Sequence, residues 1–113
     1  MSKHNLSNIK KNENFLKYIL SIKKNKKALE NLIQNSSKSE INTLSEIIFN
    51  ILKGNLKCNP ILRFEKERKL IRFLGDPKKN HLEKRKLFKK SVGKGLLLPI
   101  LGSAIPILLS FLQ

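Results

Sequence analysis

The chain has 113 residues and a net charge of +16, from 24 Lys and Arg against 8 Asp and Glu. A chain of this length buries one modest core, so we expect one domain with an appendage. The excess of positive charge favours nucleic acid or anionic lipid as the partner. The alternative explanation of the charge is AT-rich coding, which enriches Lys and Asn: 20 of the cations are Lys, and the chain also contains 12 Asn.

The positive charge is concentrated ahead of an uncharged tail. Residues 1–58 carry 11 basic and 4 acidic residues, a net +7, and residues 59–94 carry 13 and 4, a net +9, whereas residues 95–113 carry no charge. A single cysteine, Cys58, excludes an internal disulfide and fits a reducing compartment. The N-terminal segment lacks the apolar core of a secretory signal, so no export is expected.

Two short helices are predicted over residues 12–34. The first begins near Asn12 or Asn14, and the second follows Asn25, which suits an N-cap. Both segments place apolar residues at helical spacing: Phe15, Leu16, Ile19 and Leu20, then Ala28, Leu29, Leu32 and Ile33. We expect the two helices to pair as a hairpin across a basic turn.

A third helix is predicted to begin after Ser37. Ser37 and Glu40 form a capping-box pair, and Gly54 supplies a C-terminal stop. The apolar stripe of this helix consists of Ile41, Leu44, Ile48, Ile51 and Leu52.

A fourth helix is predicted to end at Gly75. Asn59 before Pro60 is the arrangement of an N-cap followed by proline at the first helical position. The apolar residues of this helix crowd toward its C-terminal half: Phe64, Leu70, Ile71, Phe73 and Leu74.

A fifth, strongly basic helix is predicted through about Lys90. Asp76 and Pro77 repeat the signal of a cap followed by proline. The apolar residues that could anchor this helix are few: Leu82, Leu87 and Phe88. We therefore expect the helix to be exposed or to fold on a polyanion.

The fold class is predicted to be all-α, because no strand-like alternation of apolar and polar residues occurs. We expect a flexible N-terminus at 1–11 and a bundle of three or four short helices at 12–75. A basic helical arm at 76–94 and a hydrophobic, proline-containing tail at 95–113 would follow.

The titratable residues indicate no catalytic or metal site. His4 and His81 stand far apart, and neither has a Cys or carboxylate at metal-ligand spacing. Cys58 lacks the neighbours of a nucleophile and is interpreted as incidental or buried. The segment "SVGKGLL" lacks the first glycine and the Ser or Thr of a phosphate-binding loop. We expect a non-enzyme without cofactor, metal or small-molecule substrate.

The basic segments predict a nucleic-acid surface with sequence-independent, salt-sensitive affinity. Few Arg, one Tyr and no Trp argue against base reading. The alternative is a solubilising face, and "KNHLEKRKLFKK" also has the cation density of a nuclear localisation signal. The candidate phosphate-binding residues are Arg63, Lys66, Arg68, Lys69, Arg72, Lys78, Lys79, Lys84, Arg85, Lys86, Lys89, Lys90 and Lys94.

The tail "GLLLPILGSAIPILLSFLQ" predicts contact with a membrane or a capsid. Its 19 residues would span ~28 Å as a helix. Pro99 and Pro106 favour a kinked inserting segment over a smooth span. The alternative is a hydrophobic strap packed on the helical core. The candidate contact residues are Leu96, Leu97, Leu98, Ile100, Leu101, Ile105, Ile107, Leu108, Leu109, Phe111 and Leu112.

The segments "IIFNILKGNLKCNPILRFEKERKLIRFL" and "KRKLFKKSVGKGLLLPILGSAIPILLSFL" together resemble a viral family. They are similar to the small virion core proteins encoded beside capsid genes in Polinton/Maverick elements and adintoviruses, which resemble adenovirus core protein X, the mu precursor. The matching positions are Ile51-Leu52-Lys53-Gly54-Asn55, Pro60, Lys84-Arg85-Lys86, Gly93, Gly95 and Leu98-Pro99.

The resemblance implies a protein of the virion and host nucleus that binds and condenses double-stranded DNA and contacts capsid proteins. Its hydrophobic end would be released or exposed during maturation or entry. The family shows adjacent glycines where an adenain-type protease could cut. Here Gly93, Lys94 and Gly95 replace them and Ser91 stands where a larger apolar residue is preferred, which argues against cleavage.

Two other functions remain open from the sequence. One is a tail-anchored or membrane-active helical protein whose basic arm binds anionic lipid. The other is a regulatory helical interaction module.

Overall fold

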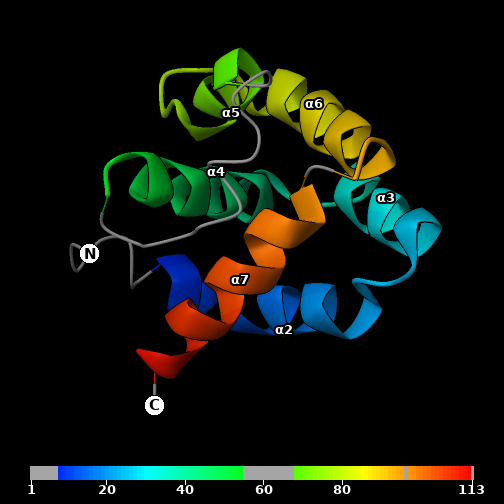
Figure 1. The fold of residues 1–113 in the computed structure, drawn as a ribbon, viewed down its shortest axis with the longest axis vertical. Helices are drawn as coiled ribbons and strands as arrows, with labels where there is room; N and C mark the ends of the chain where they lie inside the picture. The colour runs from blue at the N-terminus through cyan, green and yellow to red at the C-terminus, as the bar shows by residue number, and fades with distance from the viewer. Residues whose placement is uncertain (1–7, 55–67, 96, 113) are drawn as a thin grey trace.

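The computed structural model describes residues 8–54, 68–95 and 97–112, and all of its regular structure in these ranges is helical. The prediction of an all-α fold is confirmed. The helices bounded within these ranges are α2 (Glu13–Ile22), α3 (Lys26–Gln34), α4 (Lys38–Leu52), α5 (Arg68–Gly75), α6 (His81–Gly93) and α7 (Leu97–Ser110) (Figure 1).

Local capping determines where α3 and α4 begin. The side chain of Asn25 accepts a hydrogen bond from the Ala28 amide at 3.0 Å. At the start of α4, the Ser37 hydroxyl accepts from the Glu40 amide at 3.1 Å, and the Glu40 carboxylate accepts from the Ser37 amide at 2.8 Å. These bonds confirm both predicted caps. They are short-range and satisfy amides that the helix itself leaves unpaired.

Asn12 joins the start of α2 to α4 and does not cap α2 with its side chain. Its amide donates to the Thr43 hydroxyl at 2.7 Å and to the Ser39 hydroxyl at 3.2 Å. Residues 8–11, expected to be flexible, are helical, and Ile9 is fully buried. The N-terminal expectation was therefore wrong for these four residues.

α4 crosses the middle of the molecule. Figure 1 shows α5 and α6 on one side of it, α2 on the other, and α7 crossing in front. α4 packs against α5 and α6, α3 packs against α6, and α7 packs against α2 and α6. Every one of these helices contributes to one core, for example Leu16, Leu29, Ile47, Phe88 and Leu101.

The basic helix and the tail are part of this core. In α6, Phe88 and Val92 are fully buried, so the expectation that this helix has too little apolar surface to pack was wrong. The radius of gyration is 12.6 Å, close to the ~13 Å of a compact domain of this length. The predicted boundaries near residues 76 and 95 therefore separate segments that pack together.

The start of α6 differs from the prediction, and the predicted start of the fourth helix could not be compared. α6 begins at His81, with Asn80 as its N-cap, and not at the Asp76-Pro77 signal. Asp76 instead closes the preceding turn, because its carboxylate accepts from the Lys78 amide at 2.9 Å. The predicted start of the fourth helix at Asn59-Pro60 lies outside the described residues.

Gly75 allows α5 to approach α4 closely. A Cβ atom at this position would lie 3.0 Å from Ile48 Cγ2, 3.0 Å from Leu52 Cδ1 and 3.1 Å from the Phe49 backbone nitrogen. The backbone atom cannot move aside as a side chain can, so even a methyl group overpacks the contact.

We predict that Gly75→Ala lowers the free energy of unfolding by about 1–3 kcal/mol, because α5 must move away from α4. The matched control is Gly102→Ala in α7, where a Cβ would meet no atom within 4 Å. That substitution should raise stability by about 0.5–1 kcal/mol through helix propensity. Denaturant unfolding followed by circular dichroism measures both. Equal stability of the two variants would contradict the close contact.

Candidate nucleic-acid interface

α5 presents its cations outward because its apolar residues face the core. Ile71 and Leu74, three residues apart, are buried on one face of the helix. Arg68, Lys69 and Arg72 consequently lie on the exposed side. Helical periodicity alone therefore produces a basic outer face.

The turn between α5 and α6 continues this basic surface. Lys78 and Lys79 are exposed, and the turn is held by Asp76, whose backbone oxygen accepts from the Lys79 amide at 3.2 Å. The Lys79 ammonium lies 5.5 Å from the centroid of the Phe73 ring, within cation–π range. Asn80 then starts α6 by accepting from the Leu82 amide at 2.6 Å.

The cations of α6 divide into three groups by position. Lys86, Lys90 and Lys94 are exposed. Arg85 and Lys89 are half-buried and lie against α3 and the residues after it: the Arg85 Nη2 donates to the Ser36 carbonyl at 2.6 Å, and the Lys89 ammonium donates to the Gln34 Oε1 at 3.3 Å. These two side chains serve packing as well as charge. Lys84 forms the third group.

Lys84 was predicted to bind phosphate, but it is buried in the core with only 2% of its surface exposed. Its ammonium donates to the Ser45 hydroxyl at 2.6 Å, and Ser45 donates to the Leu74 carbonyl at 2.6 Å. Burial lowers the pKa of Lys84, and the negative charge of Asp76 opposes part of that shift. Lys84 therefore does not belong to the surface that could bind phosphate.

Of the thirteen predicted cations, the structure brings eight to the surface along α5, the turn and α6. Together with the half-buried Arg85 and Lys89, they form what we call the α5–α6 basic face. Arg63 and Lys66 lie outside the described residues. The eight exposed members are Arg68, Lys69, Arg72, Lys78, Lys79, Lys86, Lys90 and Lys94.

Beneath the basic face lies a polar pocket of about 260 Å³ between α4 and the α5–α6 turn. Glu46 and Lys84 line it together with Asn42, Ser45, Phe49, Gly75 and Pro77. The Glu46 Oε1 accepts from the Asn8 amide at 2.7 Å, while its buried Oε2 has no partner among the described residues. Burial raises the pKa of Glu46, and the hydrogen bond from Asn8 opposes that shift.

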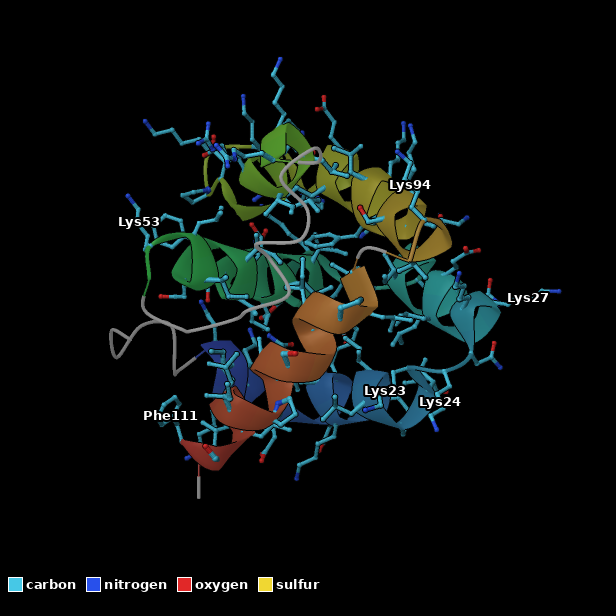
Figure 2. All side chains as sticks on the ribbon, in the orientation of Figure 1. Lys23, Lys24, Lys27, Lys53, Lys94 and Phe111 are labelled. Carbon is cyan, nitrogen blue, oxygen red and sulfur yellow. The ribbon has the colours of Figure 1, made fainter. Side chains whose placement is uncertain are left out.

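A second basic cluster, absent from the predicted set, lies at the α2–α3 turn. Lys23, Lys24, Lys26 and Lys27 are all exposed there. The Lys26 ammonium lies 3.9 Å from the position of a Cβ on Gly95, so this turn adjoins the C-terminal end of α6. Figure 2 labels Lys23, Lys24 and Lys27 on the side of the molecule opposite Lys53. The four lysines were visible in the sequence, but their proximity to α6 depends on the fold.

Five of the ten described tail residues that were predicted to contact a membrane or a capsid fill the core, which favours the strap alternative. Leu97, Ile100, Leu101, Ile105 and Leu108 are buried. The other described members lie at the surface or at the edge of the core: Ile107 and Phe111 are exposed, and Leu98, Leu109 and Leu112 are half-buried. Leu96 lies outside the described residues.

No single described helix is both long and apolar enough to cross a bilayer. α6 and α7 reach the required length and composition only as a pair, and they are bent by 106° at their junction. The predicted processing residues lie at this junction. Gly93 ends α6, Lys94 is exposed, and Gly95 turns the chain with φ of 74°.

The described residues contain no group of three His, Cys, Asp or Glu that could hold a metal ion. His81 is the first residue of α6, and His4 and Cys58 lie outside the described ranges. Comparison with protein-family models, curated proteins and solved structures finds no match for the chain. Function is therefore inferred from the residues and their arrangement.

We predict that Glu46→Gln stabilises the protein at pH 7 and that this gain shrinks as the pH falls. Because the pKa of Glu46 is raised on folding, the folded state binds more protons than the unfolded state above the ordinary carboxyl pKa. The contribution of Glu46 to stability therefore decreases as pH rises from the ordinary carboxyl pKa through the raised pKa of the folded state. Denaturant unfolding at pH 7 and pH 4.5 measures the effect. The exposed Glu83→Gln is the matched control, and a gain independent of pH would contradict the prediction.

We also predict that Leu101→Ala lowers the free energy of unfolding by about 2–5 kcal/mol, because it leaves a cavity in the core. Phe111→Ala, at a side chain that is 58% exposed, should change it by less than about 0.5 kcal/mol. Thermal unfolding of both variants provides the measurement. A tail that is detached from the core would make the two substitutions equally harmless.

Proposed function

We propose that this chain is a non-enzymatic virion core protein, viral or transposon-derived, that binds and condenses double-stranded DNA without reading its sequence. The observation that carries the proposal is the α5–α6 basic face. Two acidic residues, Asp76 and Glu83, share the elements that present its eight exposed cations. A surface of this charge density attracts any polyphosphate.

The chemistry of the face favours backbone binding over base reading. Of its eight exposed members, six are lysines, which act as point charges toward phosphate oxygens. Each phosphate neutralised by such a cation releases condensed counterions, and that release supplies affinity independent of sequence. The arginines that could form bidentate contacts with guanine, Arg68 and Arg72, are both on α5. The face therefore suits non-specific packing of a duplex.

The family resemblance supplies the biological setting of the proposal. It implies a protein of the virion and the host nucleus, with capsid proteins as further contacts. The proposal includes no catalytic step, cofactor or small-molecule substrate. Cleavage between Gly93 and Gly95 is not part of it.

A membrane-active function is the second candidate, and the exposed Ile107 and Phe111 at the end of α7 favour it. In that case the basic face would meet anionic headgroups. The core packing of α7 opposes this candidate, because insertion would require Leu101 and its buried neighbours to leave the core.

We predict that the protein binds AT-rich and GC-rich duplexes alike and that its affinity falls steeply with salt. Substituting Lys69, Lys78 and Lys86 with Gln should reduce the slope of log affinity against log salt by about 2–3, because each lost phosphate contact removes ~0.9. The matched control replaces Lys10, Lys11 and Lys38, which are exposed and lie outside the α5–α6 basic face, with Gln and should leave the slope nearly unchanged. Fluorescence anisotropy across a salt series measures both.

Two outcomes would contradict the proposal. The first is weak binding to both duplexes at low salt. The second is preferential binding to vesicles that contain anionic lipid when duplex is offered as a competitor, since that would favour the membrane-active function.

A further inference from the structure

The α2–α3 turn presents its lysines from an ordered piece of backbone. The Asn25 amide donates to the Ile22 carbonyl at 2.8 Å, and its side chain caps α3. Lys23 and Lys24 precede this residue, and Lys26 and Lys27 follow it, so four cations occupy five positions. Among the described residues, no hydrogen bond or ion pair joins the side-chain ammonium of any of the four lysines to a partner. Their charges are available to an external anion.

Placing these lysines together costs stability within the protein. Like charges at neighbouring positions repel, and the first turn of α3 contains no acidic residue that would offset Lys26 and Lys27 near the positive end of the helix dipole. The nearby acid is Glu30, which is half-buried and lies 3.4 Å from the position of a Cβ on Gly93. An external polyanion would relieve the repulsion.

The fold extends this cluster to the end of α6. Lys26 lies beside Gly95, and the preceding residue, Lys94, is exposed. We call this surface the lysine corner. Its members are Lys23, Lys24, Lys26 and Lys27, and Lys94 of the α5–α6 basic face lies at its edge.

The lysine corner and α5 lie on different sides of the molecule. Figure 1 shows α5 on one side of α4 and α2, which leads into the corner, on the other. In Figure 2, Lys23, Lys24 and Lys27 extend from the end of the molecule formed by the α2–α3 turn. The principal extents are 32 × 27 × 25 Å. The 76–80 turn precedes the N-terminal end of α6, whereas the α2–α3 turn adjoins its C-terminal end, so a duplex docked along α5 and the 76–80 turn lies at the opposite end of α6 from the corner.

We infer that the lysine corner is a second phosphate-binding surface and that one molecule bridges two duplex segments. This inference rests on the proposed function and adds its mechanism. A protein with cations on one side can coat DNA, whereas a protein with cations on two sides can link segments as a monomer. Linking follows from the avidity of two sites held at a fixed separation.

The test uses two variants of the full chain with the same loss of charge. The corner variant replaces Lys23, Lys24 and Lys27 with Gln. The control variant replaces Lys10, Lys11 and Lys38 with Gln, which are exposed residues near the starts of α2 and α4. All six positions are exposed, so both variants should fold, and circular dichroism verifies this.

Two measurements separate binding from bridging. Anisotropy with one short labelled duplex reports binding, and capture of a free labelled duplex by a bead-bound duplex reports bridging. The wild type and the control variant should bind and capture. The corner variant should bind the single duplex within about threefold of the wild type but lose at least about tenfold in capture.

The outcomes distinguish the inference from the proposed function. If the wild type fails to bind duplex at low salt, the proposed function itself is wrong. If the wild type binds without capturing, or the corner variant captures as well as the control, bridging through the corner is wrong. Light scattering of the free protein completes the test, because a dimer whose capture survives the corner substitutions would also overturn the inference.

Discussion

The arrangement of the basic surface depends on a chain of hydrogen bonds that runs through the core. Lys84 of α6 donates to Ser45 of α4, which donates to the carbonyl of Leu74 at the end of α5. This chain joins three helices at one point and fixes the rotation of α6 about its axis. With Phe88 and Val92 buried on the same face as Lys84, the α6 residues Lys86 and Lys90 lie on the exposed side. The buried Lys84 thus helps to orient the basic surface without being part of it.

The helices that could be predicted are those whose signals are local. The Ser37 and Glu40 pair and the Asn25 cap involve residues three apart, and they act as expected because no distant contact competes. The packing of α6 was missed because its buried stripe contains Lys84 and Ser91 beside the two apolar residues. Counting apolar side chains alone underestimates how much of a helix face can be buried when its polar residues form hydrogen bonds in the core. Sequence alone does not reveal those partners, since Ser45 is 39 residues away.

The candidate site shows the same division between local and distant information. Exposure of Lys69 and Arg72 follows from the helical period of α5, whereas the proximity of Lys26 to Gly95 requires the whole fold. The tail was ambiguous because it is apolar on every face, so periodicity could not distinguish a core helix from an inserting one. α7 also continues through Pro106, which lies on the exposed side, where water can satisfy the acceptor that proline leaves free.

The docking of α7 changes what a break in the chain at the α6–α7 junction would produce. Leu97, Leu101 and Leu108 would still fill their places in the core after such a cut. The two pieces would remain together as a noncovalent complex, and folding would become an association between separate molecules. The stability of that complex would then depend on its concentration. Dilution alone, with no further chemistry, would release the hydrophobic peptide.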